Sequence, residues 1–377
     1  MKGIKPSIRG VEVMFFKGKY GEAVVFTELI EEGAILQIKE FIDQDYTLGR
    51  RIRIMPDVHQ GIGCVIGLTA ELGDVVVPNL VGVDIGCGIL TVKLLNRSFD
   101  FRELDKFIRR KIPSGTKTHR DPVFLMPQIG SLKCLNELKD TKRFQKSIGT
   151  LGGGNHFIEV GRDSRGYHYL VIHSGSRNLG KQIAEYYQSI AVKDCGASYP
   201  KALCSLKGGK MDNYIHDMRV AQDYARLNRE TMATLILKEF YNDDLKNFKY
   251  FHTVHNYIDS RDKIIRKGAI SSYEGEELLI PINMRDGSIL AVGKGNPDWN
   301  YSAPHGAGRL MSRRMAKEDG EMGKFRESMD GIFTTSVHEG TLDERPSAYK
   351  PLEEILERIT DTVKVIDRII PVYNFKA

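Results

Sequence analysis

Residues 52–95 read IRIMPDVHQGIGCVIGLTAELGDVVVPNLVGVDIGCGILTVKLL. Runs of β-branched and other apolar residues alternate with glycines in this stretch, which is typical of buried strands joined by tight turns. Asp57, His59, Asp84 and Cys87 stand where apolar runs end. Because polar side chains at the points where loops leave strands are often functional, this segment predicts a β-sheet core with a site at its edge.

The same texture returns further along the chain, in LGGGNHFIEVG at 151–161 and YHYLVIHSGSR at 167–177. Apolar residues at helical spacing predict helices at 28–44, 179–191, 214–240 and 352–370, the last ended by Pro371. No internal repeat or Pro/Ser-rich linker interrupts the pattern. We therefore predict one α+β domain over residues 1–377, with central β-sheets surrounded by helices.

Composition restricts the function only loosely. The 55 Lys and Arg residues against 49 Asp and Glu residues give a net charge of +6, which permits a nucleic-acid partner without requiring one. Residues 1–16 lack the apolar core of a secretory signal, and no later apolar run is long enough to span a bilayer, so we predict a cytoplasmic protein that does not associate with membranes. Five scattered cysteines argue against a disulfide framework, so a functional cysteine is expected to be a ligand or a nucleophile.

A metal centre is the first chemical hypothesis. The glycine-containing turn in Asp84-Ile-Gly-Cys87 lets a carboxylate and a thiol face one ion, and His156, His173 and His255 lie beside glycines or other potential ligands. Thiolate, imidazole and carboxylate together suit Mn, Fe, Co or Zn better than Ca or Mg. Taken singly, each residue has an ordinary structural explanation as a turn or core side chain. A shared metal explains why so many polar groups are found together.

A phosphate site is the second hypothesis. In His305-Gly-Ala-Gly-Arg309 the glycines let backbone N–H groups approach an anion, and the guanidinium adds a fixed positive charge. An imidazole beside a phosphate can bind it, protonate a leaving group or attack phosphorus, and the residues alone leave these three roles open. Arg177, Arg313 and Lys376 are further candidates for phosphate contacts, or else solvated surface charges.

Seven segments, taken in order, resemble the signature segments of the RtcB family of RNA ligases: MPDVHQGIG, VGVDIGCG, GGGNHFIE, HSGSRNLG, VHN, SAPHGAGR and SAYKP. This resemblance implies an α+β fold with the metal centre in a deep cleft. It also implies an enzyme that joins an RNA 3′-phosphate or 2′,3′-cyclic phosphate to a 5′-hydroxyl end, in RNA repair or tRNA splicing. The cofactors that it implies are two Mn(II) ions, with GTP as co-substrate.

The resemblance also implies roles for individual residues. Cys87 corresponds to a bridging metal ligand, with Asp84 and His156 on one ion and His173 and His255 on the other. His305 corresponds to the histidine that becomes guanylylated, and Asp57 to another functional position. Nucleotide contacts are implied for Asn155, Glu159, Ser288, His305, Gly306, Ala307, Gly308, Tyr349 and Lys376, and phosphate or RNA contacts for Arg177, Arg309 and Arg313.

One loop departs from the family pattern. Residues 281–288 read PINMRDGS where the family commonly has a Pro-Gly-Ser-Met-Gly-Thr loop near the nucleotide. Ile282 and Arg285 replace small residues, so we expect altered nucleotide contacts, with Ser288 preserving one of them. The short chain resembles a bacterial branch associated with a release-factor-like protein, so the implied partners are RNA and either that protein or an archease-like activator.

Two other classes of function remain as hypotheses. A dinuclear metal phosphoesterase could use the same ligands, with His305 as an acid and no covalent nucleotide. A noncatalytic RNA-binding protein could use the metal only to stabilise its fold. His59, His252 and His338 receive no role.

Overall fold

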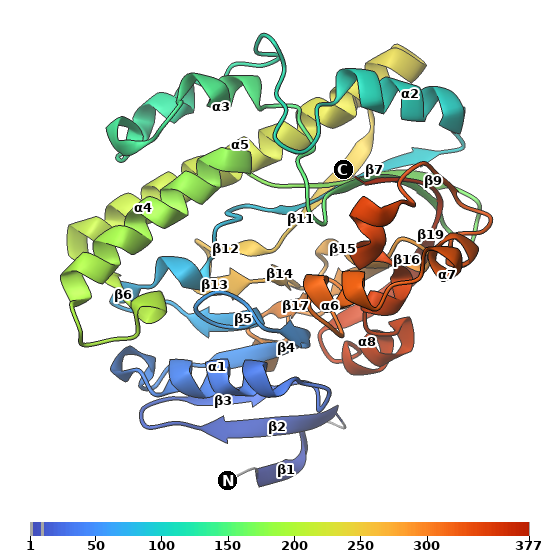
Figure 1. The fold of residues 1–377 in the computed structure, drawn as a ribbon. Coiled ribbons are helices and arrows are strands. Elements are labelled where there is room, and N and C mark those ends of the chain that lie inside the picture. The colour runs from blue at the N-terminus through green and yellow to red at the C-terminus, as the bar shows by residue number, and fades with distance from the viewer. Residues whose placement is uncertain (1–2, 9–10, 377) are drawn as a thin grey trace.

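The computed structural model describes residues 3–8 and 11–376, so Met1, Lys2, Arg9, Gly10 and Ala377 of the predicted domain lie outside the described residues. Two large β-sheets form the interior, and helices lie along their outer sides (Figure 1). The predicted α+β class is confirmed. The prediction that the whole chain forms one domain stays a prediction.

A seven-stranded sheet contains the first half of the quoted segment. Its order is β1 (Gly3–Ile8), β2 (Val11–Lys17), β3 (Glu22–Val25), β4 (Ile52–His59), β5 (Ile66–Glu71), β13 (Ile264–Lys267) and β12 (Asn256–Ile258). The β4–β5 pairing is irregular between Ile54 and His59, because several β4 residues there face a short part of β5. Bulges of this kind redirect side chains, and this one contains Asp57.

The second sheet contains the candidate metal ligands. Its order is β11 (Lys249–Val254), β7 (Gly88–Leu95), β9 (His168–Ser174), β8 (Phe157–Arg162), β19 (Val363–Lys376), β16 (Gly287–Gly293) and β15 (Glu277–Asn283), with β18 (Phe333–Thr334) on β19. Leu90, Ile158 and Ile172 of its central strands are fully buried. Fully buried strands of this kind position their ends firmly, which is what a site at the sheet edge needs.

The helices are α1 (Glu32–Ile42), α2 (Phe101–Lys111), α3 (Lys142–Lys146), α4 (Arg177–Cys195), α5 (Gly208–Tyr241), α6 (Arg313–Glu318), α7 (Met322–Ser328) and α8 (Leu352–Arg358). α4 and α5 pack together and cross the molecule diagonally, while α6 to α8 gather on one side (Figure 1). The helices predicted at 28–44, 179–191 and 214–240 are confirmed. Among the described residues, no helix is both long enough and apolar enough to cross a membrane.

The helix predicted at 352–370 is wrong beyond its first two turns. α8 ends at Arg358, and β19 begins at Val363 and pairs with β16 and then with β8. The β-branched run of β19 suits a strand, and pairing with two neighbours outweighs a spacing that also fits a helix. Pro371 lies inside β19, where the pairing with β8 is irregular, and so it does not end a helix.

Candidate active site and metal centre

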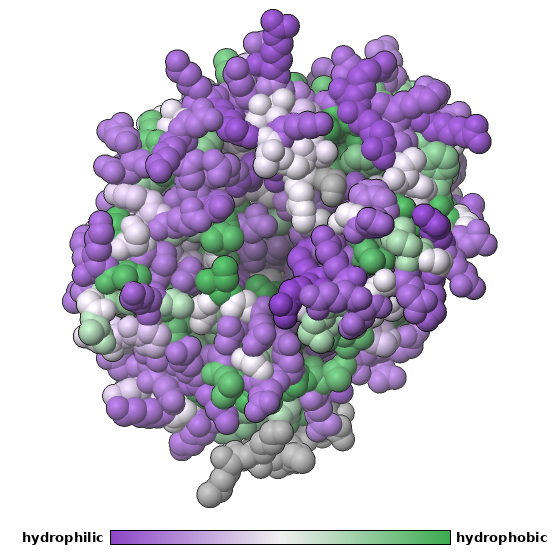
Figure 2. Space-filling model, viewed as in Figure 1, coloured by the Kyte–Doolittle hydropathy of each residue, from purple (hydrophilic) through white to green (hydrophobic). Residues whose placement is uncertain are grey.

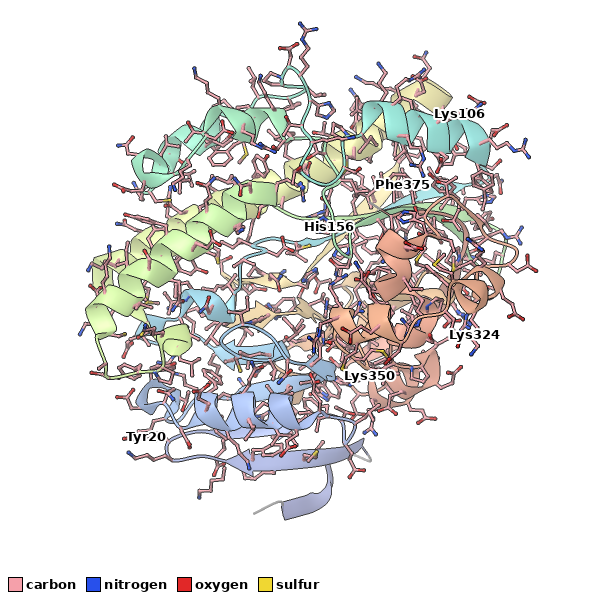
Figure 3. The ribbon with its side chains drawn as sticks, viewed as in Figure 1. Tyr20, Lys106, His156, Lys324, Lys350 and Phe375 are labelled. Carbon is pink, nitrogen blue, oxygen red and sulfur yellow. The ribbon has the colours of Figure 1, made fainter. Side chains whose placement is uncertain are left out.

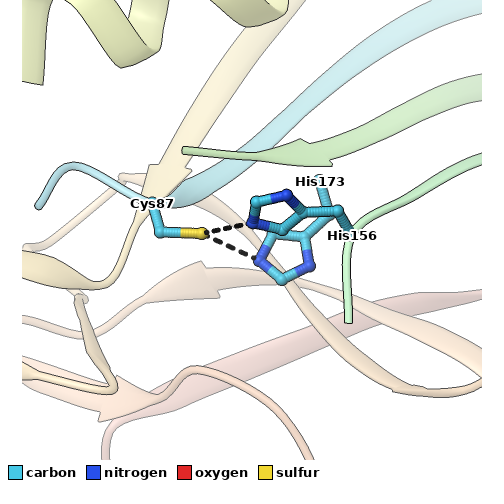
Figure 4. A group of neighbouring side chains, drawn as sticks. All are labelled: Cys87, His156 and His173. Carbon is cyan, nitrogen blue, oxygen red and sulfur yellow. Dashed lines mark hydrogen bonds between the residues drawn. The ribbon is translucent and has the colours of Figure 1, made fainter. Parts of the chain in front are cut away.

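Three adjacent strands bring together a thiol and two imidazoles. Cys87 directly precedes β7, His156 directly precedes β8, and His173 lies in β9, where it pairs with Ile89 on one side and Phe157 on the other. The Cys87 Sγ atom lies 3.4 Å from Nε2 of His156 and 3.4 Å from Nε2 of His173 (Figure 4). All three side chains are buried, and their ligand atoms lie within 4.8 Å of one another.

Backbone carbonyls orient both imidazoles toward the sulfur. Nδ1 of His156 donates to the Leu151 carbonyl at 2.8 Å, and Nδ1 of His173 donates to the Asn155 carbonyl at 3.2 Å. With the proton on Nδ1, each Nε2 keeps its lone pair for a metal, which is the usual arrangement for metal-binding histidines.

The separations of these atoms fit a divalent ion. A zinc-like ion bonded at about 2.3 Å to sulfur and about 2.0–2.1 Å to nitrogen holds such donors roughly 3.1–3.6 Å apart, for bond angles between about 90° and 110°. The observed 3.4 Å separations lie in that range. Burial and the Asp84 charge raise the pKa of the Cys87 thiol well above its usual value, and burial lowers the pKa of His173 well below its own. Metal binding would therefore displace the thiol proton and use imidazoles that are already neutral.

A row of imidazoles leads from the sulfur to His305. Nε2 of His173 lies 3.2 Å from Nε2 of His255, and the rings of His255 and His305 are 4.7 Å apart between centroids. Nδ1 of His305 donates to Oδ2 of buried Asp57 at 2.6 Å, and the His305 backbone N–H donates to the same oxygen at 3.0 Å. The carboxylate thus fixes the ring with Nε2 free.

The Asp57 contact depends on a glycine. Gly308 has a φ of 75°, and a Cβ atom there would lie 2.4 Å from the backbone oxygen of Asp57. In the structure this glycine therefore allows the loop after His305 to pack against β4.

Asp84 and Arg177 lie beside the group formed by Cys87, His156 and His173, here called the metal cluster. Asp84 is not among the three residues whose ligand atoms meet, although its charge raises the pKa of the Cys87 thiol. The Arg177 side chain packs against Gly152 and donates to the Gly115 carbonyl at 2.9 Å. Its φ of 56° is unusual for a residue with a side chain, and such strain is often found at functional positions.

A cavity of about 410 Å³ opens beside this row, and it has the size of a small-molecule site. The face shown in Figure 2 is hollowed near its centre, where hydrophilic and hydrophobic residues meet. His173 and His255 lie in its wall, so the metal cluster adjoins the cavity. All the residues predicted to contact nucleotide line it, together with two of the predicted phosphate-binding arginines: Asn155, Glu159, Ser288, His305, Gly306, Ala307, Gly308, Tyr349, Lys376, Arg309 and Arg313.

Three predicted metal ligands, Asp84, Cys87 and His156, are not in the cavity wall, and neither are Arg177 and Asp57. His156 lies near the middle of the molecule (Figure 3). The structure therefore separates a nucleotide-sized cavity from a region beyond His173 that contains the thiol and Arg177.

The loop at residues 281–288, whose sequence departs from the family pattern, contributes one of its two unusual residues to the cavity. Ile282 lines the wall, whereas Arg285 does not and instead pairs with Asp286 at 2.8 Å. The charge of Arg285 is thus paired with a neighbouring carboxylate. Relative to the family loop, the change at the cavity wall is the larger side chain of Ile282. Ser288 also lines the wall, as predicted.

Glu344 is a site residue that the sequence analysis missed. It is buried, and its carboxylate accepts hydrogen bonds from Lys376, Arg313 and Tyr349, the last at 2.7 Å. Burial alone would raise its pKa, but the charges of Lys376 and Arg313 lower it to about 2. Arg309 also donates to this carboxylate, at 3.4 Å, so one ionised group holds four predicted ligand-binding side chains in place. The acidic pair before SAYKP was its only signal.

Glu159 differs from Glu344. Burial raises its pKa to about 8, although the hydrogen bond that Asn374 donates to one oxygen at 2.8 Å and the charge of Lys376 both lower it. Within the described residues, the other oxygen accepts no hydrogen bond. The Asn374 side-chain oxygen also has no partner in this part of the chain. Both residues line the cavity, so these two oxygens are available to a molecule bound there.

Two buried polar residues of α5 support the metal cluster, and the sequence analysis missed both. Asn228 exchanges hydrogen bonds with the backbone of Gly149, Thr150 and Gly175 and with the Ser174 hydroxyl. Arg229 donates to the carbonyls of Gly86 and Ser174, at 2.9 and 2.8 Å. His252, which had no predicted role, lies 3.4 Å from Nε of Arg229. These residues fix the segments that carry Cys87, His156 and His173.

The fold and the site thus define an α+β protein with a candidate metal centre beside a nucleotide-sized cavity. Comparison of the sequence with known proteins assigns the chain to a family. The model of the family tRNA-splicing ligase RtcB matches residues 46–131 and 127–377. RNA-splicing ligase RtcB of Escherichia coli strain K12 is 30% identical, over 84% of this chain and 88% of that protein. tRNA-splicing ligase RtcB of Aeropyrum pernix is 27% identical, over 81% and 83%. The chain belongs to the RtcB family.

We predict that Asn228→Ala destabilises the protein by about 3 kcal/mol or more, because it leaves several buried backbone groups without partners. The free energy of unfolding, measured in urea, checks this. Asn213→Ala is the matched control, since Asn213 is exposed on the same helix and should change stability by less than about 0.5 kcal/mol. Equal stabilities for the two variants would contradict the supporting role.

Proposed function

We propose that this chain is a Mn(II)- and GTP-dependent RNA ligase that joins 3′-phosphate or 2′,3′-cyclic phosphate ends to 5′-hydroxyl ends. The relatives are named as RNA-splicing or tRNA-splicing ligases, which supports the substrate class. The observation that carries the chemistry is the 2.6 Å contact between Asp57 and Nδ1 of His305, at the wall of a nucleotide-sized cavity. An imidazole held in this way presents an unprotonated Nε2 as a nucleophile.

In the first step, the lone pair of His305 Nε2 attacks the α-phosphorus of GTP. The bond from that phosphorus to the bridging oxygen breaks, and pyrophosphate leaves with the electron pair. The proton on Nδ1 stays in place, and the Asp57 carboxylate balances the positive charge that develops on the ring. Arg309 and Arg313, in the same wall, are suited to neutralise phosphate oxygens.

In the second step, an oxygen of the RNA 3′-phosphate attacks the phosphorus on His305, and the imidazole leaves with its electron pair restored. The RNA end then carries a phosphoanhydride to GMP. In the third step, the 5′-hydroxyl oxygen attacks the RNA phosphorus, loses its proton, and expels GMP as the 3′–5′ bond forms. A 2′,3′-cyclic phosphate must first be opened by water to a 3′-phosphate.

We propose that the metal is held by Cys87, His156, His173 and His255, with Asp84 as a further ligand. These donors suit Mn(II), and we propose two ions. Such ions, when bound, lower the charge repulsion between phosphates and the attacking group. Arg177 is not in the cavity wall, which suits a contact with RNA phosphate rather than with the nucleotide.

The role in RNA repair or tRNA splicing stays a prediction. The cytoplasmic location and the archease-like or release-factor-like partner also stay predictions. So do the individual nucleotide contacts.

We predict that incubation with GTP labelled at its α-phosphorus and Mn(II) leaves label on the protein after denaturing electrophoresis. His305→Ala should abolish the label, because the nucleophile is gone. Asp57→Asn should lower the rate of labelling about a hundredfold or more, because it removes the charge that orients the ring. His216→Ala is the control, since this histidine lies on α5 and outside the cavity wall.

Unlabelled wild-type protein that hydrolyses phosphate esters would instead favour the phosphoesterase. RNA binding without label or end joining, across metals and pH, would favour a binding protein.

We predict that GMP affinity rises with pH and levels off above about 8. A guanine donates two N–H groups, which a carboxylate accepts better than a carboxylic acid, so binding selects ionised Glu159. Since burial raises the pKa of free Glu159 to about 8, a proton must leave on binding below that pH. The dissociation constant should then fall roughly tenfold per pH unit from about pH 6 to 8. Calorimetric titration with GMP measures it.

Glu159→Gln is the matched variant for this experiment, because it preserves the shape of the side chain and cannot titrate. Its dissociation constant should change little over the same pH range. Parallel pH profiles for wild type and variant would show that Glu159 does not ionise on binding.

A further inference from the structure

Three consecutive apolar side chains are exposed in the loop between α2 and α3. Val123, Phe124 and Leu125 have exposed fractions of 43%, 51% and 64%. Pro122 and Pro127 flank them, and Gln145 of α3 holds Met126 by two hydrogen bonds, at 2.9 and 3.0 Å. An anchored loop that presents a run of apolar residues to solvent is unfavourable unless something binds there.

The surroundings of this loop are strongly basic. Residues 111–146 contain eight Lys and Arg residues against three Asp and Glu residues, and so they hold five of the six net positive charges of the chain. Lys117, Arg120, Lys139 and Lys142 are exposed. None of these four is among the ion pairs found within the described residues. Free cations in the same segment as an exposed aromatic ring fit a polyanion with stacking groups.

The loop is connected to the metal cluster by short contacts. The Leu151 N–H donates to the Pro113 carbonyl at 2.9 Å, and the Leu151 carbonyl orients His156. The Gly115 N–H donates to the Gly152 carbonyl at 2.9 Å, and Arg177 donates to the Gly115 carbonyl. In Figure 1 this segment lies between α2 and α3 on the far side of α5 from β5, and Figure 3 shows Lys106 of α2 at the outer edge of the same region. Within residues 117–125, Nε2 of His119 also lies 3.0 Å from the Gly149 carbonyl, so the loop is tied to the segment that carries His156.

We propose that residues 117–125, here called the 117–125 loop, bind single-stranded RNA next to the end that is to be joined. A base stacks on Phe124, and Lys117 and Arg120 contact backbone phosphates. This proposal rests on the proposed ligase function and adds a docking surface outside the cavity. A protein partner that covers an apolar run would not need this concentration of unpaired positive charge, so RNA is the favoured occupant.

The test is fluorescence anisotropy with the full chain and a 12-nucleotide single-stranded RNA that carries a 3′-phosphate and a 5′-fluorophore, without GTP. Phe124→Leu should weaken binding about fivefold or more, because leucine keeps the apolar bulk without the ring. Phe124→Tyr should bind within about twofold of wild type. Lys117→Gln/Arg120→Gln should reduce the slope of log affinity against log salt by about 1.4, the value for two lost phosphate contacts.

Matched controls lie on the N-terminal part of the chain. Leu48→Ala removes an exposed apolar side chain, and Lys19→Gln/Lys39→Gln removes two exposed charges. Both should leave RNA affinity and its salt dependence as in wild type. Labelling with GTP, which needs no RNA, is measured for every variant to show that it is folded.

Wild-type affinity in Phe124→Leu, or an unchanged salt slope in Lys117→Gln/Arg120→Gln, would overturn the RNA surface; unchanged affinity in both would point to a protein occupant. If one variant is not labelled, the other decides the question. A wild-type chain that binds RNA through this loop but takes no label from GTP would contradict the ligase function and leave the surface standing.

Discussion

The site depends on the register of three adjacent strands. Because His173 of β9 pairs with both β7 and β8, the residues that precede those strands, Cys87 and His156, meet at its ring. Burial makes this meeting unfavourable for charged groups, and it raises the pKa of the thiol and lowers that of His173. A bound divalent cation would offset this unfavourable burial. It would replace the proton on the Cys87 sulfur and bind the imidazole lone pairs, which the backbone carbonyls have already oriented.

His305, the proposed nucleophile, belongs to a different part of the fold. His305 follows β17 (Ser302–Pro304), and the carboxylate that orients it comes from the bulge of β4 in the seven-stranded sheet. His255 stands between β11 of one sheet and β12 of the other, so its backbone links the two. The proposed reaction thus requires the two sheets to keep a fixed relative position, so that Asp57 stays hydrogen-bonded to His305 while His305 stays next to His255. Buried Asn228 and Arg229 in α5 serve that need on the metal side.

Much of this could be predicted from the sequence. Glycine-punctuated apolar runs indicated β4, β5, β7, β8 and β9, whereas the other strands of the two sheets were not predicted. Neighbouring glycines and ligand-type residues pointed to Cys87, His156, His173 and His305, which the fold brings together. The error at 363–370 came from a run whose apolar spacing fits a helix as well as a strand, a choice that pairing with β8 and β16 decides. Glu344 and Asn228 were missed because their roles depend on partners far away in the chain. Arg285 was expected to change the nucleotide contacts, but in the fold its guanidinium forms an ion pair with Asp286. The sequence does not show how these two side chains are oriented.

The most direct test of the account is a crystal structure of the protein soaked with Mn(II), with anomalous diffraction recorded at an energy where manganese scatters strongly. If these side chains bind the metal, an anomalous peak should lie within bonding distance of Cys87 Sγ and of Nε2 of His156 or His173. A saturated crystal with no peak at the sulfur, or with peaks only at surface carboxylates, would contradict it.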